Sequence, residues 1–154
     1  MQIASNGTTD FQHTLAAEVT INGVGIHTGQ NVEMVLKPAA PNSGIVFQRV
    51  DLPGTPNVKA DVDNVVDTTR STTIEANGAR VSTIEHLLAA LVGCGVDNVL
   101  IEINGGEVPI LDGSAAPFVD AILKVGVQKQ EAVKVYYTLQ HNITFVDVAK
   151  KVEM

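Results

Sequence analysis

The sequence predicts an α+β fold, a two-layer sandwich in which a mostly antiparallel sheet carries two main helices on one face. Short segments of alternating or continuous apolar residues, typical of strands, recur along the chain. Two segments, residues 84–92 and 115–125, carry apolar residues at helical spacing instead. Asn77-Gly78 is a strong signal for a tight hairpin, which makes the strands around it antiparallel.

Composition limits the classes of protein that the chain can represent. Its 154 residues, 45 % of them hydrophobic, are enough for an ordinary domain with its own core. The net charge of −7 and the lack of a basic stripe argue against a nucleic-acid partner. We expect no membrane span, because no run of about 20 apolar residues occurs, and the N-terminal residues lack a signal-peptide pattern. Cys94 is the single cysteine, so no internal disulfide is possible and a reducing compartment is favoured.

The first predicted strand, starting at residue 19, runs into a glycine-rich loop. Gly23, Gly25 and Gly29 surround His27 and permit conformations or close approaches that a Cβ would block. Such a loop could cradle a phosphate, but a tight bulge or turn is the more frequent outcome of this spacing. Both alternatives remain open from the sequence.

The next segments predict further strands and connections. Residues 32–37, 44–49 and the Thr-rich stretch 68–75 are expected to be strands, and 51–57 a loop. Residues 58–66 and their surroundings carry three acids, which invite a calcium-site interpretation. However, the glycine and terminal glutamate of an EF-hand loop are missing, so a solvated connection is favoured. The Asn77-Gly78 hairpin is expected to lead directly into the first helix. The three acids are Asp61, Asp63 and Asp67.

The first helix has two unusual faces. Ser82 as N-cap and Glu85 three residues later complete a capping-box pattern. The opposite face is small and uncharged, unlike a solvent face, so we expect this helix to be covered on both sides. The buried stripe is predicted as Ile84, Leu87, Leu88, Leu91 and Val92, and the opposite face as His86, Ala89, Ala90 and Gly93.

The second helix, residues 115–125, is predicted to be ordinary and amphipathic. Residues 98–104 form a strand before it, and Asp112-Gly-Ser114 supplies the turn and N-cap. Pro117 is tolerated because it falls in the first turn. Its apolar stripe comprises Phe118, Ile122 and Val125. The polar residues 128–133 are interpreted as a linker, and residues 135–139 and 142–146 as the start of new strands.

Glu85-His86 is the one close carboxylate–imidazole pair in a promising position. The capping role explains Glu85 without any chemistry, and a lone helical histidine is usually not a ligand. The pair is not a zincin motif, because Ala90 stands where the second histidine is needed. The remaining histidines are scattered, and Cys94 is interpreted as a small buried hydrophobe.

Three motifs together resemble the UDP-3-O-acyl-N-acetylglucosamine deacetylase family, zinc hydrolases of lipid A synthesis and so of outer-membrane biogenesis. They are Gly23-Val-Gly-Ile-His-Thr-Gly29, Ser82-Thr-Ile-Glu-His-Leu87 and the segment Glu107–Phe118 with its Asp-Gly-Ser-Ala-Ala-Pro core. The family fold has two similar α+β domains whose helices pack against each other.

The resemblance also implies roles for individual residues. His86 is expected to be a zinc ligand, and Glu85 the general base on zinc-bound water attacking the acetamide carbonyl. Ser71 is expected near the metal and substrate. His27 is expected near the substrate, without an assigned role. The implied substrate is UDP-3-O-acyl-N-acetylglucosamine, and the implied location is cytoplasmic.

The chain departs from the family pattern in one respect. The family completes its zinc site with a later His-Lys-x-x-Asp motif, and this sequence contains no His-x-x-x-Asp. We therefore expect a flexible tail at 1–14, the deacetylase N-terminal domain at 15–127, and a linker with the start of a second domain at 128–154. Such a chain is expected to be inactive alone and to form a homodimer through its first helix. A non-catalytic binding or assembly module is the alternative.

Overall fold

The computed structural model describes residues 10–136, 141 and 143–153. Residues Phe11–Ala132 form one compact unit, and the terminal segments on either side group separately. No helix in the described part of the chain is long and apolar enough to cross a membrane.

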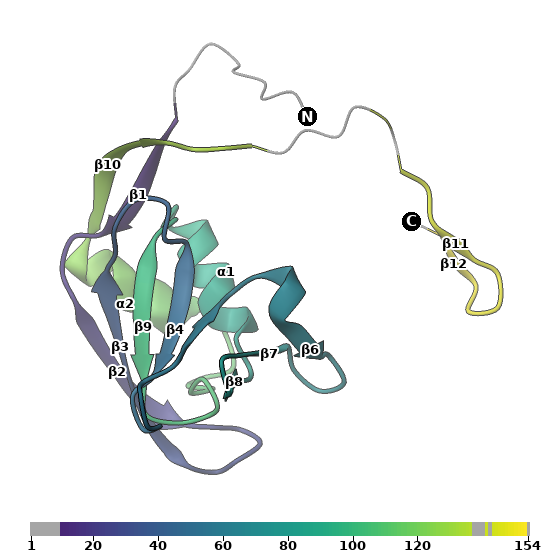
Figure 1. Cartoon of the computed structure of the whole chain (residues 1–154), viewed down its shortest axis with the longest axis horizontal. Helices are drawn as coiled ribbons and strands as arrows, with labels where there is room; N and C mark the ends of the chain where they lie inside the picture. Colours follow the sequence, from purple (N-terminus) through teal and green to yellow (C-terminus); the bar gives the residue numbers. More distant parts are fainter. Residues whose placement is uncertain (1–9, 137–140, 142, 154) are drawn as a thin grey trace. The chain divides into compact units, whose positions relative to one another are not determined.

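A five-stranded sheet forms the first layer of the compact unit (Figure 1). All neighbours pair antiparallel except β4 and β9, which are parallel. Alternation in β3 and β9 sends every second side chain inward, so the sheet has one apolar face. The strands, in spatial order, are β2 (Val19–Val24), β3 (Asn31–Pro38), β9 (Val99–Ile103), β4 (Ile45–Arg49) and β5 (Asn57–Lys59).

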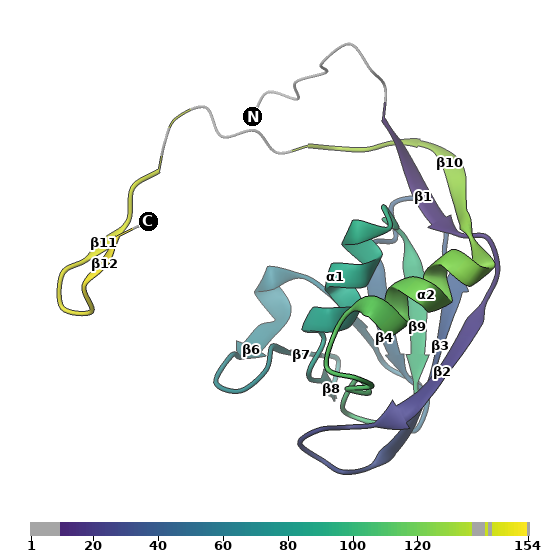
Figure 2. The same cartoon turned by 180° about the vertical axis from the view of Figure 1, so that it is seen from behind.

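Helices α1 (Glu85–Gly93) and α2 (Ala116–Val125) lie together on one face of this sheet (Figure 2). Their apolar side chains and the inward side chains of the sheet form a single core. The predicted α+β two-layer fold is confirmed. Fully buried members of this core include Met34, Leu36, Phe47, Leu87, Leu91, Ile101, Phe118 and Ile122.

The predicted buried stripe of α1 is partly wrong. Leu87 and Leu91 are fully buried, but Val92 is 72 % exposed. Ala90, expected on the opposite face, is 1 % exposed because α2 packs against α1. Ala89 and Gly93 are exposed, so the described residues do not supply the second cover that we expected for this helix.

A separate three-stranded sheet precedes α1 and corrects two expectations. It consists of β6 (Val65–Asp67), β7 (Thr73–Ala76) and β8 (Ala79–Val81). Asn77 and Gly78 have φ values of 54° and 77°, the left-handed pair of a tight hairpin, as predicted. The Thr-rich strand starts at Thr73, not at residue 68, and β8 separates the hairpin from the helix. The acidic connection contains the short helix η1 (Val62–Asn64).

Strands β1 (Phe11–Leu15) and β10 (Val127–Val133) pair with each other. Residues expected in the tail and in the linker are therefore strands. The buried amide of Asn98 explains part of this order, because its Nδ2 donates to Gln12 Oε1 at 2.8 Å and to Gln130 Oε1 at 2.7 Å. A buried side-chain amide costs free energy unless it is hydrogen-bonded. Asn98 therefore stabilises the positions of both strands, because each strand supplies one acceptor. The sequence alone does not reveal this pairing.

The C-terminal segment forms a small hairpin of β11 (Val146–Asp147) and β12 (Val152–Glu153). The strand predicted at 142–146 is thus reduced to its last residue, and residue 142 lies outside the described residues. The strand predicted at 135–139 falls mostly on residues 137–140, also outside them. The division into an N-terminal domain and the start of a second domain stays a prediction.

Candidate active site

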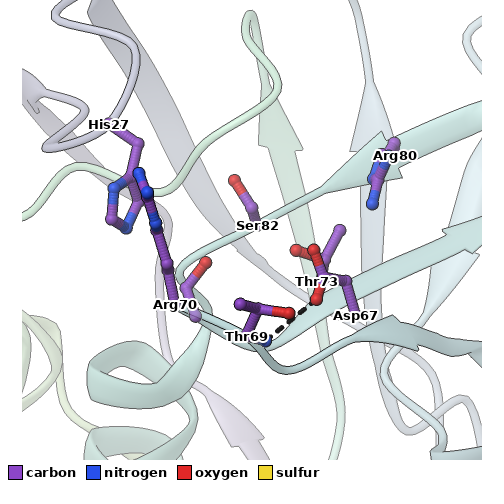
Figure 3. Close-up of a pocket in the computed structure, with 8 residues that line it drawn as sticks. His27, Asp67, Thr69, Arg70, Thr73, Arg80 and Ser82 are labelled. Atoms are coloured by element: carbon purple, nitrogen blue, oxygen red, sulfur yellow. Dashed lines mark hydrogen bonds between the residues drawn. The ribbon is translucent and has the colours of Figure 1, made fainter.

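An open pocket of about 360 Å³ lies beside the three-stranded sheet, and Figure 3 shows its lining. It brings together His27, from the loop after β2, and Ser71, from the loop before β7. These are the two residues that we expected near the substrate. The other lining residues are Asp67, Thr69, Arg70, Thr73, Arg80 and Ser82.

The pocket lining is polar and carries charges of both signs. In Figure 3, Arg70 lies on the same side as His27, and Arg80 on the opposite side. The Oδ1 atom of Asp67 accepts a hydrogen bond from Thr69 N–H at 2.9 Å. Hydrogen bonds from Thr69, together with the Arg80 charge, hold the pKa of Asp67 below its usual range. The pocket therefore suits a polar, hydrogen-bonding ligand. Arg70 and Arg80 had no predicted role, because nothing in the spacing distinguishes them from surface arginines.

Glu85 does not form the predicted capping box. Ile84 precedes the helix and makes no side-chain cap. The Ser82 hydroxyl donates instead to the Gly106 carbonyl at 3.2 Å. The Glu85 carboxylate accepts a hydrogen bond from the backbone N–H of Thr72, next to Ser71. The capping-box prediction was wrong because Thr83, with a φ of 60°, turns the chain between Ser82 and the helix.

This environment keeps Glu85 ionised. Burial alone raises its pKa, but the hydrogen bonds from Thr72 and the nearby charge of His86 outweigh burial, so the pKa of Glu85 lies below its usual range. An ionised carboxylate at neutral pH can accept a proton.

His86 is half-buried and lies close enough to two acids to affect them. Its charge contributes to lowering the pKa of Glu85 and also that of Asp112. For Asp112 the larger cause is the pair of hydrogen bonds from the Ser114 hydroxyl, at 2.8 Å, and N–H, at 2.9 Å. Neither Glu85 nor His86 is among the described residues that line the pocket.

The described residues do not form a complete metal site. No group of three or more His, Cys, Asp or Glu side chains among them could hold a metal ion. A catalytic zinc takes about three protein ligands. His86 can therefore serve as one ligand, but the described residues do not supply the rest of the set.

Glu107 is a buried acid that had no individual role among the sequence-based predictions. It is fully buried, and its Oε1 accepts from His27 N–H and the Thr83 hydroxyl, both at 3.0 Å. Its Oε2 accepts from Thr28 N–H at 2.9 Å and the Thr28 hydroxyl at 2.8 Å. Burial alone raises the pKa of Glu107, but these hydrogen bonds bring it below its usual range. The one sequence signal that could have pointed to a buried Glu107 is its position between Gly105-Gly106 and the apolar segment that follows.

The glycine-rich loop therefore binds an anionic group of the protein itself, the Glu107 carboxylate. The amide groups of His27 and Thr28 point to Glu107, so they are already occupied. Of the two alternatives for this loop, these hydrogen bonds support the turn, and a phosphate could not use these two amides while Glu107 holds them.

Comparisons with known proteins agree on one family. Residues 12–154 match the family model described as UDP-3-O-acyl N-acetylglycosamine deacetylase. A UDP-3-O-acyl-N-acetylglucosamine deacetylase of Geobacter sp. (strain M21) is 50 % identical over 92 % of the chain and 46 % of that protein. That of Teredinibacter turnerae is 46 % identical over 91 % and 46 %. A bifunctional enzyme LpxC/FabZ of Bacteroides thetaiotaomicron is 46 % identical over 88 % of the chain and 30 % of the relative. The chain spans about half the length of the deacetylases.

Proposed function

The chain belongs to the UDP-3-O-acyl N-acetylglycosamine deacetylase family, and from this premise we propose that it is the N-terminal domain of a zinc-dependent amide hydrolase. The complete enzyme removes the N-acetyl group of UDP-3-O-acyl-N-acetylglucosamine in lipid A biosynthesis. The observation that carries the proposal is the 50 % identity to such a deacetylase over 92 % of the chain. A cytoplasmic location and a role in outer-membrane biogenesis are part of the same proposal.

Glu85 is the proposed general base. As an ionised carboxylate at neutral pH, it can accept a proton from the attacking water. The Thr72 N–H holds the carboxylate beside the loop that carries Ser71. Ser71 and His27, which line the same pocket, are proposed to contact the substrate.

His86 is the proposed zinc ligand within this chain. A half-buried imidazole next to an ionised carboxylate is a suitable donor. When bound, zinc would polarise the amide carbonyl and acidify a water molecule. We propose that residues outside the described part of the chain complete the ligand set.

The incomplete ligand set leads us to propose that this chain alone is inactive. The proposed N-terminal domain is the compact unit Phe11–Ala132, which takes in strand residues that we had expected in the tail and the linker. The residues after it are proposed to be the linker and the start of a second domain. A stand-alone binding or assembly module is the competing proposal. It is favoured by the exposed apolar surface of α1, where Val92 is 72 % exposed.

The decisive experiment is a deacetylation assay with substrate and excess zinc. The chain is assayed alone and after fusion to the part of the Geobacter relative that it does not match. We expect turnover from the fusion and none from the chain alone. In the fusion, Glu85→Gln should lower kcat by about 10²–10⁴-fold. Asp120→Asn is the control variant, because Asp120 is an acid exposed on α2, and it should leave kcat unchanged.

Three results would count against the proposal. Turnover by the chain alone that Glu85→Gln abolishes would disprove the need for a second half. A fusion whose activity survives Glu85→Gln would disprove the role of Glu85. An inactive fusion that folds and binds no substrate would favour the assembly module.

A further inference from the structure

The Glu107 carboxylate connects two parts of the candidate site that are distant in the sequence. Its partners are His27 and Thr28 in the loop after β2, and Thr83 just before α1. His27 lines the pocket, and α1 begins with Glu85 and His86. The same buried group therefore contacts the segment that carries a pocket wall and the segment that leads to the proposed base and ligand.

The loop is shaped around this carboxylate. It closes through hydrogen bonds from Gly29 N–H to the Gly25 carbonyl, at 2.9 Å, and from Gly25 N–H to the Gln30 carbonyl, at 3.0 Å. The amides of His27 and Thr28 then converge on Glu107, an arrangement of N–H groups that binds anions in many proteins. A Cβ on Gly25 would overlap with Glu107 Oε2 and Thr28 Oγ1. Glycine at this position is therefore required for the carboxylate to enter.

The other side of the contact is a strained turn. Thr83 has a φ of 60°, which is unusual for a β-branched residue. Its hydroxyl donates to Glu107 Oε1. Ser82, directly before Thr83, is paired with both neighbours of Glu107: Ser82 N–H donates to the Gly106 carbonyl and Val108 N–H donates to the Ser82 carbonyl, both at 3.0 Å. The bond from Thr83 thus fixes the turn from which α1 starts.

We infer that Glu107 is a positioning residue of the proposed active site: it sets the place of His27 relative to the start of α1. The inference rests on the proposed function for its catalytic consequence, but not for the ordering of the loop. Glu107 acts through His27, Thr28 and Thr83, and it takes no part in proton transfer.

The first test measures loop order by amide hydrogen exchange in the 154-residue chain. Glu107→Gln removes the negative charge and places the side-chain NH₂ group, a donor, against groups that are themselves donors. Gly25→Ala displaces the carboxylate by steric overlap. Each should speed exchange of the His27 and Thr28 amides by about tenfold or more, the effect of losing one such hydrogen bond. Amides of β9 should change far less. Gly93→Ala is the matched control, because a Cβ there meets nothing within 4 Å.

The second test separates positioning from stability in the active fusion. Loss of folded protein lowers apparent kcat and leaves KM unchanged, whereas displacement of a pocket wall raises KM. We expect Glu107→Gln to raise KM by about tenfold. Thr83→Val, which removes only the link to α1, should also lower kcat/KM, and Thr83→Ser should restore it. Thr83→Val keeps the question testable if Glu107→Gln fails to fold.

The inference is overturned if loop and β9 amides accelerate equally, or if kcat falls with KM unchanged. Equal activity of Thr83→Val and the parent would also overturn it. Failure of the proposed function looks different, because Glu85→Gln would then retain turnover while the exchange result on the loop still stands.

Discussion

The two helices cover the same face of the sheet, but they begin in different ways. Before α2, Ser114 donates to Asp112, and Ala116 N–H donates to Ser114 Oγ at 3.1 Å, so the contacts are local. At α1, the first acid accepts a hydrogen bond from Thr72, thirteen residues earlier. Local contacts of this kind stabilise the start of their own helix, even though the expected N-cap at Ser114 is replaced by Ala115, which makes no side-chain cap. A side chain that reaches a distant loop fixes one element relative to another, as a functional site requires.

Their outer surfaces differ as well. On α2, the exposed surface includes Leu123 together with the charged residues Asp120 and Lys124. On α1, Glu85 in the first turn is exposed and charged, whereas the exposed residues after it, Ala89, Val92 and Gly93, carry no charge. The helix that bears the proposed catalytic pair is therefore also the one whose outer surface is uncharged beyond its first turn.

The largest expected effect tests which side of α1 faces the core. Leu91 is fully buried, so Leu91→Ala should lower the free energy of unfolding by about 2–5 kcal/mol. Val92 belongs to the stripe predicted from the sequence but is exposed, so Val92→Ala should change it by less than about 0.5 kcal/mol. Urea denaturation of both variants measures the difference. Similar losses in the two variants would mean that α1 is rotated from the orientation described.

A smaller effect compares the two helix starts. Ser114→Ala removes a hydroxyl that both donates to Asp112 and accepts from Ala116, so we expect a loss of about 1 kcal/mol in the free energy of unfolding. Ser82→Ala removes a single bond of 3.2 Å to the Gly106 carbonyl and no helix cap, and should cost less. Thermal unfolding of both variants measures the difference. A larger loss for Ser82→Ala than for Ser114→Ala would contradict the structure and support the capping box predicted from the sequence.

Local signals predicted much of the fold. The alternation in β3 and β9, the Asn77-Gly78 hairpin and the apolar stripe of α2 each depend on neighbouring residues, and each is found in the structure. Phe118 and Ile122 are fully buried, as their spacing indicates.

Features that depend on distant partners were not predictable in the same way. Strand β10 is polar in sequence and is a strand because it pairs with β1. Glu85 satisfies a capping pattern, but Thr72 competes for its carboxylate. Glu107 is ordered by donors about 80 residues earlier and 24 residues earlier in the chain. The resemblance to a family directed attention to Glu85, His86, Ser71 and His27, whereas Glu107 needed the structure.

The prediction with the smallest expected change in stability concerns self-association through α1. The expected homodimer uses the uncharged surface of Ala89, Val92 and Gly93, and apolar surface left in water favours association. Ala90 is unsuitable for the test because it is buried, and a charge there would disturb the core.

Val92→Glu tests the contact better than a charge at Ala90, because it places the charge on the exposed surface. It should change the free energy of unfolding by less than about 0.5 kcal/mol. If α1 forms the contact, light scattering across a concentration series should show dimer for the parent chain and monomer for Val92→Glu. Leu123→Glu is the control on α2, because Leu123 is 64 % exposed but lies among charged residues, and it should leave the dimer intact. A parent chain that stays at 16.2 kDa at every concentration would disprove the dimer. A dimer that survives Val92→Glu but not Leu123→Glu would move the contact from α1 to α2, and would remove the distinction between the two outer surfaces.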